Sequence, residues 1–140
     1  MFIEKNTKIK QVIVTAGENF NGIIFSLKSL KDVVQKSSGT IKNRLMFGEF
    51  NYPRDPTCTY FKNVSHMITD LFLDGNNLIC EIETLNTPKG KILEEIIERN
   101  EEEIALKMQG KLISPVADLP KINQFYLHSV YVIIKDKNVH

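Results

Sequence analysis

The chain lacks the features that mark several classes of protein. Its 140 residues include two cysteines, no tryptophan and no apolar run near the ~18 residues that cross a membrane. Cys58 and Cys80 lie far apart, without the spacing of metal ligands, so we interpret them as reduced thiols. The N-terminus has no apolar segment of the signal-peptide kind. The sequence therefore predicts neither a secreted protein nor a membrane span nor a metal centre.

Charge of either sign is not in excess. The formal net charge is +1 and no Lys/Arg-rich run occurs, which argues against a nucleic-acid partner. No phosphate-binding loop, Gly-x-Ser-x-Gly or His-Glu-x-x-His motif is present, so no cofactor is expected. Acidic residues do cluster near residue 100, where we expect a solvated helix face or a docking surface for a basic partner. They are Glu94, Glu95, Glu98, Glu101, Glu102 and Glu103.

Hydrophobic periodicity and turn residues predict an α+β fold in one domain, residues 1–140. Most strands should pair antiparallel, in a curled sheet or small barrel of six to seven strands with two flanking helices. The predicted strands are 8–15, 23–25, 45–50, 64–73, 78–85, 103–110 and 122–134, and the helices are 27–36 and 88–99.

Capping signals set the predicted helix ends. Ser26 can cap the first helix, which we expect to stop at residues 37–39. Thr87 can cap the second helix, with Pro88 at its first position, and Asn100 can close it. Its predicted buried stripe is Ile92, Leu93, Ile96 and Ile97.

The strand at residues 103–110 organises the rest of the chain. Its apolar residues should face the core, and its small or polar residues should face away from it. The first set is Ile104, Leu106 and Met108; the second is Ala105, Lys107 and Gln109. Such an outward face is typical of a binding surface, and also of an ordinary edge strand.

The histidines offer little generic chemistry. His66 follows Ser65 on a predicted strand, and because neighbouring strand residues point to opposite faces, we do not expect a nucleophile–base pair. His66 and His128 fit structural roles better than catalytic ones. His140 is the last residue and is set aside.

Four segments, in order, carry a resemblance to a known family. They are residues 19–26, residues 45–53 (Leu-Met-Phe-Gly-Glu-Phe-Asn-Tyr-Pro), residues 64–68 with 85–91 (Val-Ser-His-Met-Ile and Leu-Asn-Thr-Pro-Lys-Gly-Lys), and residues 104–110. Together they resemble the prohead (capsid maturation) proteases of contractile-tailed phages, serine peptidases with a fold like the herpesvirus assembly protease. The resemblance implies this fold for nearly the whole chain.

The same resemblance implies a site whose chemistry is degenerate. The nucleophile position holds Ala105 and the general-base position holds Tyr52. The implied third-member positions are His66, His128 and Tyr131, and the implied substrate-binding residues are Glu49, Lys107 and Gly110. Alanine cannot attack a carbonyl, and a tyrosine with a pKa near 10 is a poor base at pH 7.

Three interpretations follow. The first is a proteolytically inactive relative in the host cytoplasm, within the assembling phage head or virion, that binds scaffold or capsid protein segments, with self-association left open. The second is a working capsid-maturation serine endopeptidase in which Ala105 replaces an encoded serine and His66 or His128 is the base. The third is an unrelated small α+β binding module. For the first, we expect Tyr52, Ala105 and His66 in one shallow groove, and an extended partner segment on the edge of strand 104–110.

Overall fold

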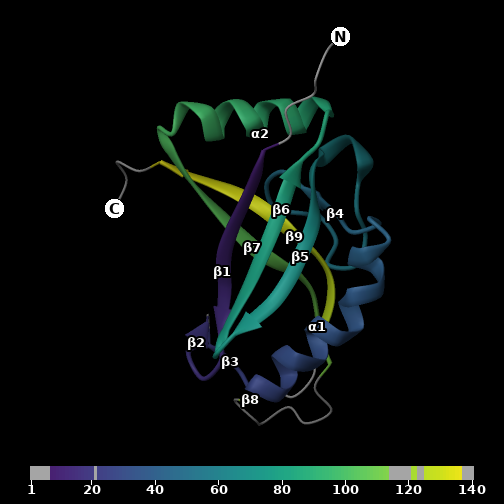
Figure 1. Cartoon of the computed structure of the whole chain (residues 1–140), viewed down its shortest axis with the longest axis vertical. Helices are drawn as coiled ribbons and strands as arrows, with labels where there is room; N and C mark the ends of the chain where they lie inside the picture. Colours follow the sequence, from purple (N-terminus) through teal and green to yellow (C-terminus); the bar gives the residue numbers. More distant parts are fainter. Residues whose placement is uncertain (1–6, 21, 114–120, 123–124, 137–140) are drawn as a thin grey trace.

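The computed structural model describes residues 7–20, 22–113, 121–122 and 125–136 (Figure 1). Its described part contains two α-helices and seven strands of three or more residues. The elements are β1 (Lys8–Thr15), β2 (Asn19–Phe20), β3 (Ile23–Phe25), α1 (Leu27–Lys42), β4 (Phe47–Glu49), the 3-10 turn η1 (Phe61–Asn63), β5 (Val64–Asp74), β6 (Asn77–Thr84), α2 (Pro88–Arg99), β7 (Glu102–Leu112), β8 (Lys121–Ile122) and β9 (Phe125–Asp136).

The strands form three sheets. A four-stranded antiparallel sheet has the order β1-β6-β5-β4, β7 pairs with β9 in a long antiparallel ribbon, and β2, β3 and β8 form a small third sheet. In Figure 1 the ribbon crosses behind the four-stranded sheet, α2 lies across the upper end and α1 lies at the lower right. The predicted α+β class with two helices and curled, mostly antiparallel sheets is confirmed, and the described strands do not close into a barrel.

The hydrophobic core lies between the sheet and the ribbon, where apolar side chains of both are removed from water. Ile68, Leu78 and Ile82 of the sheet meet Val130 and Val132 of the ribbon in one buried cluster. The predicted inward face of β7 is confirmed, since its apolar residues either belong to this cluster or pack against it. They are Ile104, Leu106 and Met108.

Two seams join the sheet to the ribbon. At one, Phe50 just after β4 pairs with Val132 of β9 as an isolated parallel bridge. At the other, the side-chain amide of Gln11 on β1 bonds the backbone of β7: Nε2 donates to the carbonyl oxygen of Ile104 (2.6 Å) and Oε1 accepts from the N–H of Leu106 (3.1 Å). A side chain thus takes the place of a strand ladder on that side.

The helix starts were predicted correctly, and one helix end was not. Ser26 caps α1 by accepting a hydrogen bond from the N–H of Ser29. The predicted stop at residues 37–39 is wrong, because α1 continues to Lys42. Burial of Ser37 and Ile41 against the core offsets the cost of Gly39 within a helix, about 1 kcal/mol.

The second helix begins and ends at the predicted residues. Thr87 accepts a hydrogen bond from the N–H of Gly90 (2.9 Å), and Asn100 ends the helix in a left-handed conformation. Within the predicted stripe, Leu93 is fully buried, whereas Ile92 is 43% exposed, so the stripe is narrower than predicted.

Candidate functional site

The outer face of the β7–β9 ribbon carries the positions that the family resemblance marks. Ala105 pairs with Ile133 and Lys107 pairs with Tyr131 across the ribbon. Directly paired residues share a face, so these four side chains lie together, on the side away from the core residue Leu106. The ribbon therefore sets the nucleophile position and one third-member position on one surface.

Tyr52 reaches the same surface from the loop after β4. The N–H of Asn51 donates to the carbonyl oxygen of Val132 (2.7 Å), which holds the loop against β9. The rings of Tyr52 and Tyr131 then lie 5.7 Å apart between centroids, tilted by 49°, with Tyr52 69% exposed. The structure thus brings the base position and a third-member position into contact, both as phenols.

The phenol of Tyr131 does not offer the chemistry of a general base. Burial, and to a lesser extent the neighbouring Tyr52, raises the pKa of Tyr131, so its hydroxyl keeps its proton at neutral pH. The residue on the adjacent strand, Ala105, has a methyl group with no proton to give. The contact of Tyr52 with Tyr131 is therefore a packing contact between aromatic rings.

Residues 51–60 form a loop, the 51–60 loop, that hydrogen bonds hold against the ribbon. Gln109 donates from Nε2 to the carbonyl oxygens of Asp55 (2.7 Å) and Cys58 (2.9 Å). Thr59 Oγ1 lies 2.7 Å from His128 Nε2. We predicted that Gln109 faces away from the core, but it is 2% exposed because the loop covers it. The outer face is open near Tyr52 and closed beneath this loop.

His66 lies in the interior, away from that surface. The ring has no exposed surface; its Nε2 donates to the carbonyl oxygen of Val130 (2.7 Å), and its Nδ1 accepts from the hydroxyl of Ser65 (2.7 Å). Burial lowers the pKa of His66 to about 4, so the ring is neutral at pH 7. Gly48 packs directly on it, leaving no space for a Cβ atom.

One prediction about His66 is wrong, and the reason given for another does not hold. It does not share a shallow groove with Tyr52 and Ala105, because it is enclosed between the sheet and the ribbon. Its side chain also does bond that of Ser65, since the hydroxyl and the ring can meet despite opposite strand faces. Both residues are completely buried, so no substrate can reach the pair.

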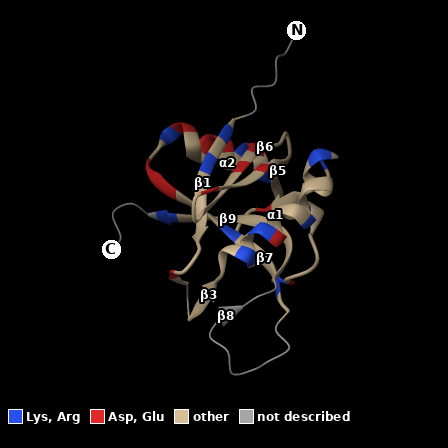
Figure 2. Ribbon diagram, turned by 60° about the horizontal axis from the view of Figure 1, so that its bottom comes forward, with Lys and Arg blue, Asp and Glu red and all other residues tan. Residues whose placement is uncertain are grey.

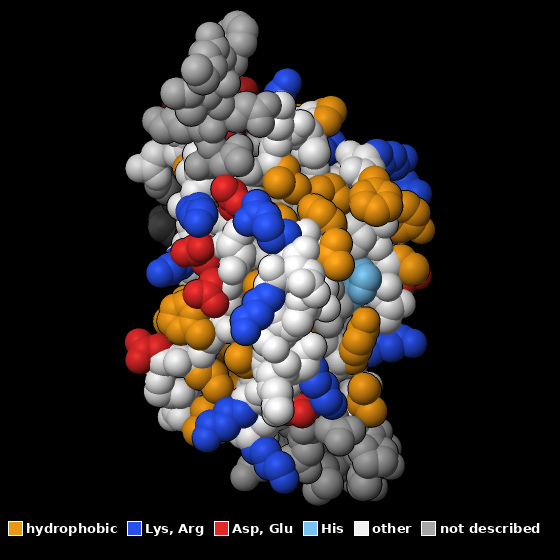
Figure 3. Space-filling view, turned by 45° about the vertical axis from the view of Figure 1, so that its right-hand side comes forward, with side chains coloured by type: hydrophobic (Ala, Val, Ile, Leu, Met, Phe, Trp, Pro, Cys, Tyr) orange, Lys and Arg blue, Asp and Glu red, His pale blue; other side chains and the backbone are white. Residues whose placement is uncertain are grey.

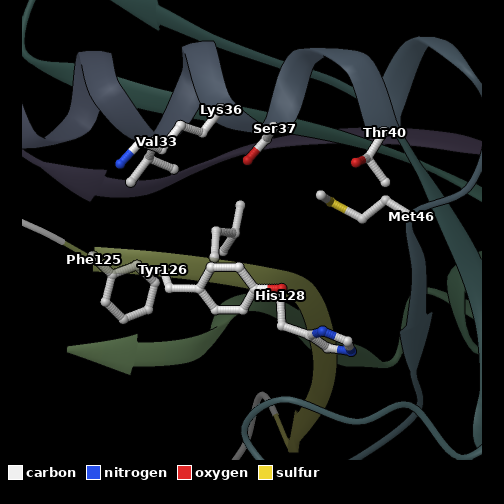
Figure 4. Close-up of a pocket in the computed structure, with 9 residues that line it drawn as sticks. Val33, Lys36, Ser37, Thr40, Met46, Phe125, Tyr126 and His128 are labelled. Atoms are coloured by element: carbon white, nitrogen blue, oxygen red, sulfur yellow. The ribbon is translucent and has the colours of Figure 1, made fainter. Parts of the chain in front are cut away.

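His128 lies at the edge of a cavity of about 200 Å³ between α1 and β9. In Figure 4, Val33, Ser37 and Thr40 of α1 lie on one side of this space and Phe125 and Tyr126 of β9 on the other, while the His128 ring points away from α1. The bond to Thr59 makes His128 an anchor for the 51–60 loop. His140, the remaining histidine, lies outside the described residues.

The three residues implied for substrate binding have different surroundings. Glu49 is buried and accepts a hydrogen bond from Asn63 Nδ2 (3.2 Å). Gly110 follows a register shift in the ribbon, where a Cβ would strike the carbonyl oxygen of Tyr126. Lys107 is partly exposed on the outer face, beside Tyr131. The three residues therefore do not form one cluster on the outer face.

Three aromatic side chains between residues 52 and 61 are exposed. They are Tyr52, Tyr60 and Phe61, and Figure 3 shows hydrophobic side chains forming a band on one side of the molecule. Within the described ranges, His, Cys, Asp and Glu side chains do not gather in groups of three that could hold a metal ion. No helix in the described part is long and apolar enough to cross a membrane.

Sequence reasoning missed the residues that shape this face from beneath. Gln109 and Thr59 hold the 51–60 loop, and neither belongs to a motif. A weak signal was available for Gln109, a polar residue with several donors and acceptors on a long strand next to a glycine.

Comparison with known proteins bears on the fold. No protein-family model matches the sequence, and a comparison with curated proteins finds no match. Among solved structures, the chain resembles the capsid assembly protease of bacteriophage T4, with a TM-score of 0.70 and 16% sequence identity over 90% of this chain and 80% of that one. This chain therefore has a prohead-protease-like fold, as the four sequence segments predicted.

Proposed function

We propose that this protein acts in phage head assembly without cleaving peptide bonds. It would hold an extended segment of a scaffold or capsid protein, in the host cytoplasm where heads assemble. Support for the setting comes from its fold likeness to the bacteriophage T4 capsid assembly protease. At this identity the likeness concerns the fold, so the function rests on the site residues.

The observation that carries the proposal is the outer face of the ribbon. Serine peptidases need a nucleophile and a base within hydrogen-bond reach of one another. Here the two positions hold Ala105 and Tyr52, and Tyr52 packs against Tyr131. His66, which could serve as a base in an active enzyme, is sealed in the core. Loss of both chemical groups favours an inactive protein over a single serine replacement.

The test is reaction with a fluorophosphonate probe, using protein with the gene-encoded residue at position 105. We expect no labelling between pH 5 and 9, and no cleavage of co-expressed scaffold and major capsid proteins from the same phage. Cleavage that is lost on treatment with serine-peptidase inhibitors would overturn the proposal. An encoded serine at position 105 would support the working endopeptidase instead.

A second arm tests the assembly role itself. We expect the chain to co-sediment with prohead particles when it is expressed with the scaffold and capsid proteins. Absence from these particles, together with a gene neighbourhood lacking portal, scaffold and capsid genes, would favour an unrelated α+β module. Ala105→Ser serves as the matched variant, and we expect it to remain unlabelled because Tyr52 still provides no base.

A further inference from the structure

At the seam between β1 and β7, a side chain makes the hydrogen bonds that a neighbouring strand would make in a sheet. Gln11 bonds the carbonyl oxygen of Ile104 and the N–H of Leu106, two backbone groups on the same edge of β7. An added strand would bond this pair of groups, because alternate residues present both groups to one side. Gln11 thus holds a strand-binding position with a side chain.

A groove continues from Gln11 along this edge. It has a volume of about 360 Å³, which lies at the low end of the range for binding sites, about 300–1,000 Å³. Partly buried Ile9, Ile97 and Ile104 form its apolar lining. We call it the seam groove; its remaining lining residues are Lys10, Gln11, Asn100, Glu102 and Glu103.

The charge at the seam groove is acidic. Glu102 and Glu103 line it on the β7 side. Among the described residues that line it, Lys10 is the one cation; it is directed to Glu81 (3.7 Å between Nζ and Oε2) and lies over the ring of Phe72. Figure 2 shows acidic residues along α2 and the adjoining chain. The groove therefore favours a partner that carries positive charge.

We propose that the seam groove binds an extended, basic segment of a partner protein, which adds to the edge of β7 as a strand. Apolar side chains of the segment would face the three isoleucines, and its lysines or arginines would face Glu102 and Glu103. Strand addition needs free backbone groups at a strand edge and pockets for alternate side chains. The groove supplies the pockets, and displacement of the Gln11 side chain would free the carbonyl oxygen of Ile104 and the N–H of Leu106. This inference rests on the proposed function and places the segment on the edge of β7 that faces β1, away from the outer face that carries Ala105.

The experiment uses an unlabelled seven-residue peptide of alternating lysine and valine, titrated into the ¹⁵N-labelled full chain. We expect saturable binding at tens to hundreds of micromolar, with the largest amide shifts between Glu102 and Leu106. Glu102→Gln/Glu103→Gln should weaken binding about five- to tenfold, since rim carboxylates act through charge complementarity. Glu18→Gln/Asp74→Asn is an equal charge change at exposed positions between β1 and β2 and at the end of β5, and it should change binding less than twofold.

Two further arms separate strand addition from loose attraction of charge. A peptide N-methylated at alternate residues keeps its charge but loses ladder hydrogen bonds, and we expect it not to bind. Gln11→Ala removes the side chain that occupies β7, so affinity should rise several-fold, with thermal unfolding as the check on folding. Equal binding by both peptides, or no effect of the Glu102 and Glu103 substitutions, would overturn the inference.

The outcomes also distinguish the two proposals. Probe labelling of the native protein would refute the inactive-assembly function and leave the titration unaffected. If the protein does not react with the fluorophosphonate probe and the peptide titration also shows no binding, only the seam-groove proposal is refuted. The partner would then bind at the Ala105 face.

Discussion

The buried His66 should make the stability of this protein depend on pH. In the folded state its neutral ring donates to Val130 and accepts from Ser65, with no water access. A proton on Nδ1 would abolish the acceptor and place a charge in the core. Folded protein therefore resists protonation of this ring, whereas the unfolded chain does not.

The size of the effect follows from the two pKa values. Burial lowers the pKa of His66 from 6.5 to about 4, so the unfolded state binds more protons between these values. Stability is then fully present above pH 6.5 and falls as the pH drops toward 4. The loss is about 1 kcal/mol at pH 5.5 and about 2 to 3 kcal/mol at pH 4.5.

Urea unfolding between pH 7.5 and 4.5 measures this loss. With a slope of about 2 kcal/mol per molar, the midpoint should fall by roughly 1 M at pH 4.5. His66→Gln can keep a donor toward Val130 and does not titrate, so its midpoint should change much less over this range. His128→Gln is the matched control and should retain the dependence. An identical pH dependence in wild type and His66→Gln would refute the reasoning.

Three further predictions concern packing, each read by urea or thermal unfolding unless stated. Gly48→Ala should prevent stable folding, because the added Cβ would overlap the imidazole of His66 and the carbonyl oxygen of Val130. Gly39→Ala has open space around it and should stabilise α1 by up to about 1 kcal/mol. Leu93→Ala should cost about 2–5 kcal/mol and the more exposed Ile92→Ala clearly less; equal costs would contradict the burial pattern. Gln109→Leu should speed amide exchange in the 51–60 loop, and unchanged exchange would show that its two bonds do not hold the loop.

Local signals predicted the helices and most strands because they act within a few residues. Thr87 and Pro88 define the start of α2, and Asn100 its end, through backbone geometry that distant contacts do not alter. The end of α1 depended instead on burial of Ile41, which is decided by packing against other elements. A seryl-seryl-glycine sequence carries no information about that packing.

Residue alternation predicted the core-facing residues of β7, where the ladder with β9 is regular over residues 102–109. A register shift between Ile68 and Asp70 in β5 breaks the alternation that sequence reasoning assumes. The predicted strand at residues 122–134 is β8 and β9 in the structure, with residues 123–124 outside the described part. Bulges add one residue without a reliable sequence signal, so faces beyond them invert.

The family resemblance indicated positions for a candidate site, and the sequence did not indicate what surrounds those positions in the fold. The motif order pointed to Tyr52 and Ala105, and the contact of Tyr52 with Tyr131 agrees with a shared surface. The enclosure of His66 depends on β9 crossing over β5, and the cover over Gln109 depends on a loop fifty residues earlier. Such long-range contacts have no counterpart in local periodicity.

The Gln11 seam also has a consequence for the order in which the protein is completed during synthesis. Gln11 and its partner Ile104 are separated by 93 residues. At about 5 to 20 residues per second, the ribosome adds Ile104 roughly 5 to 20 s after it has added Gln11. Throughout that interval β1 has one side without its final neighbour, and an extended chain nearby can pair with it. The early product of translation is thus the stage at which chaperone contact or mispairing with another copy matters most.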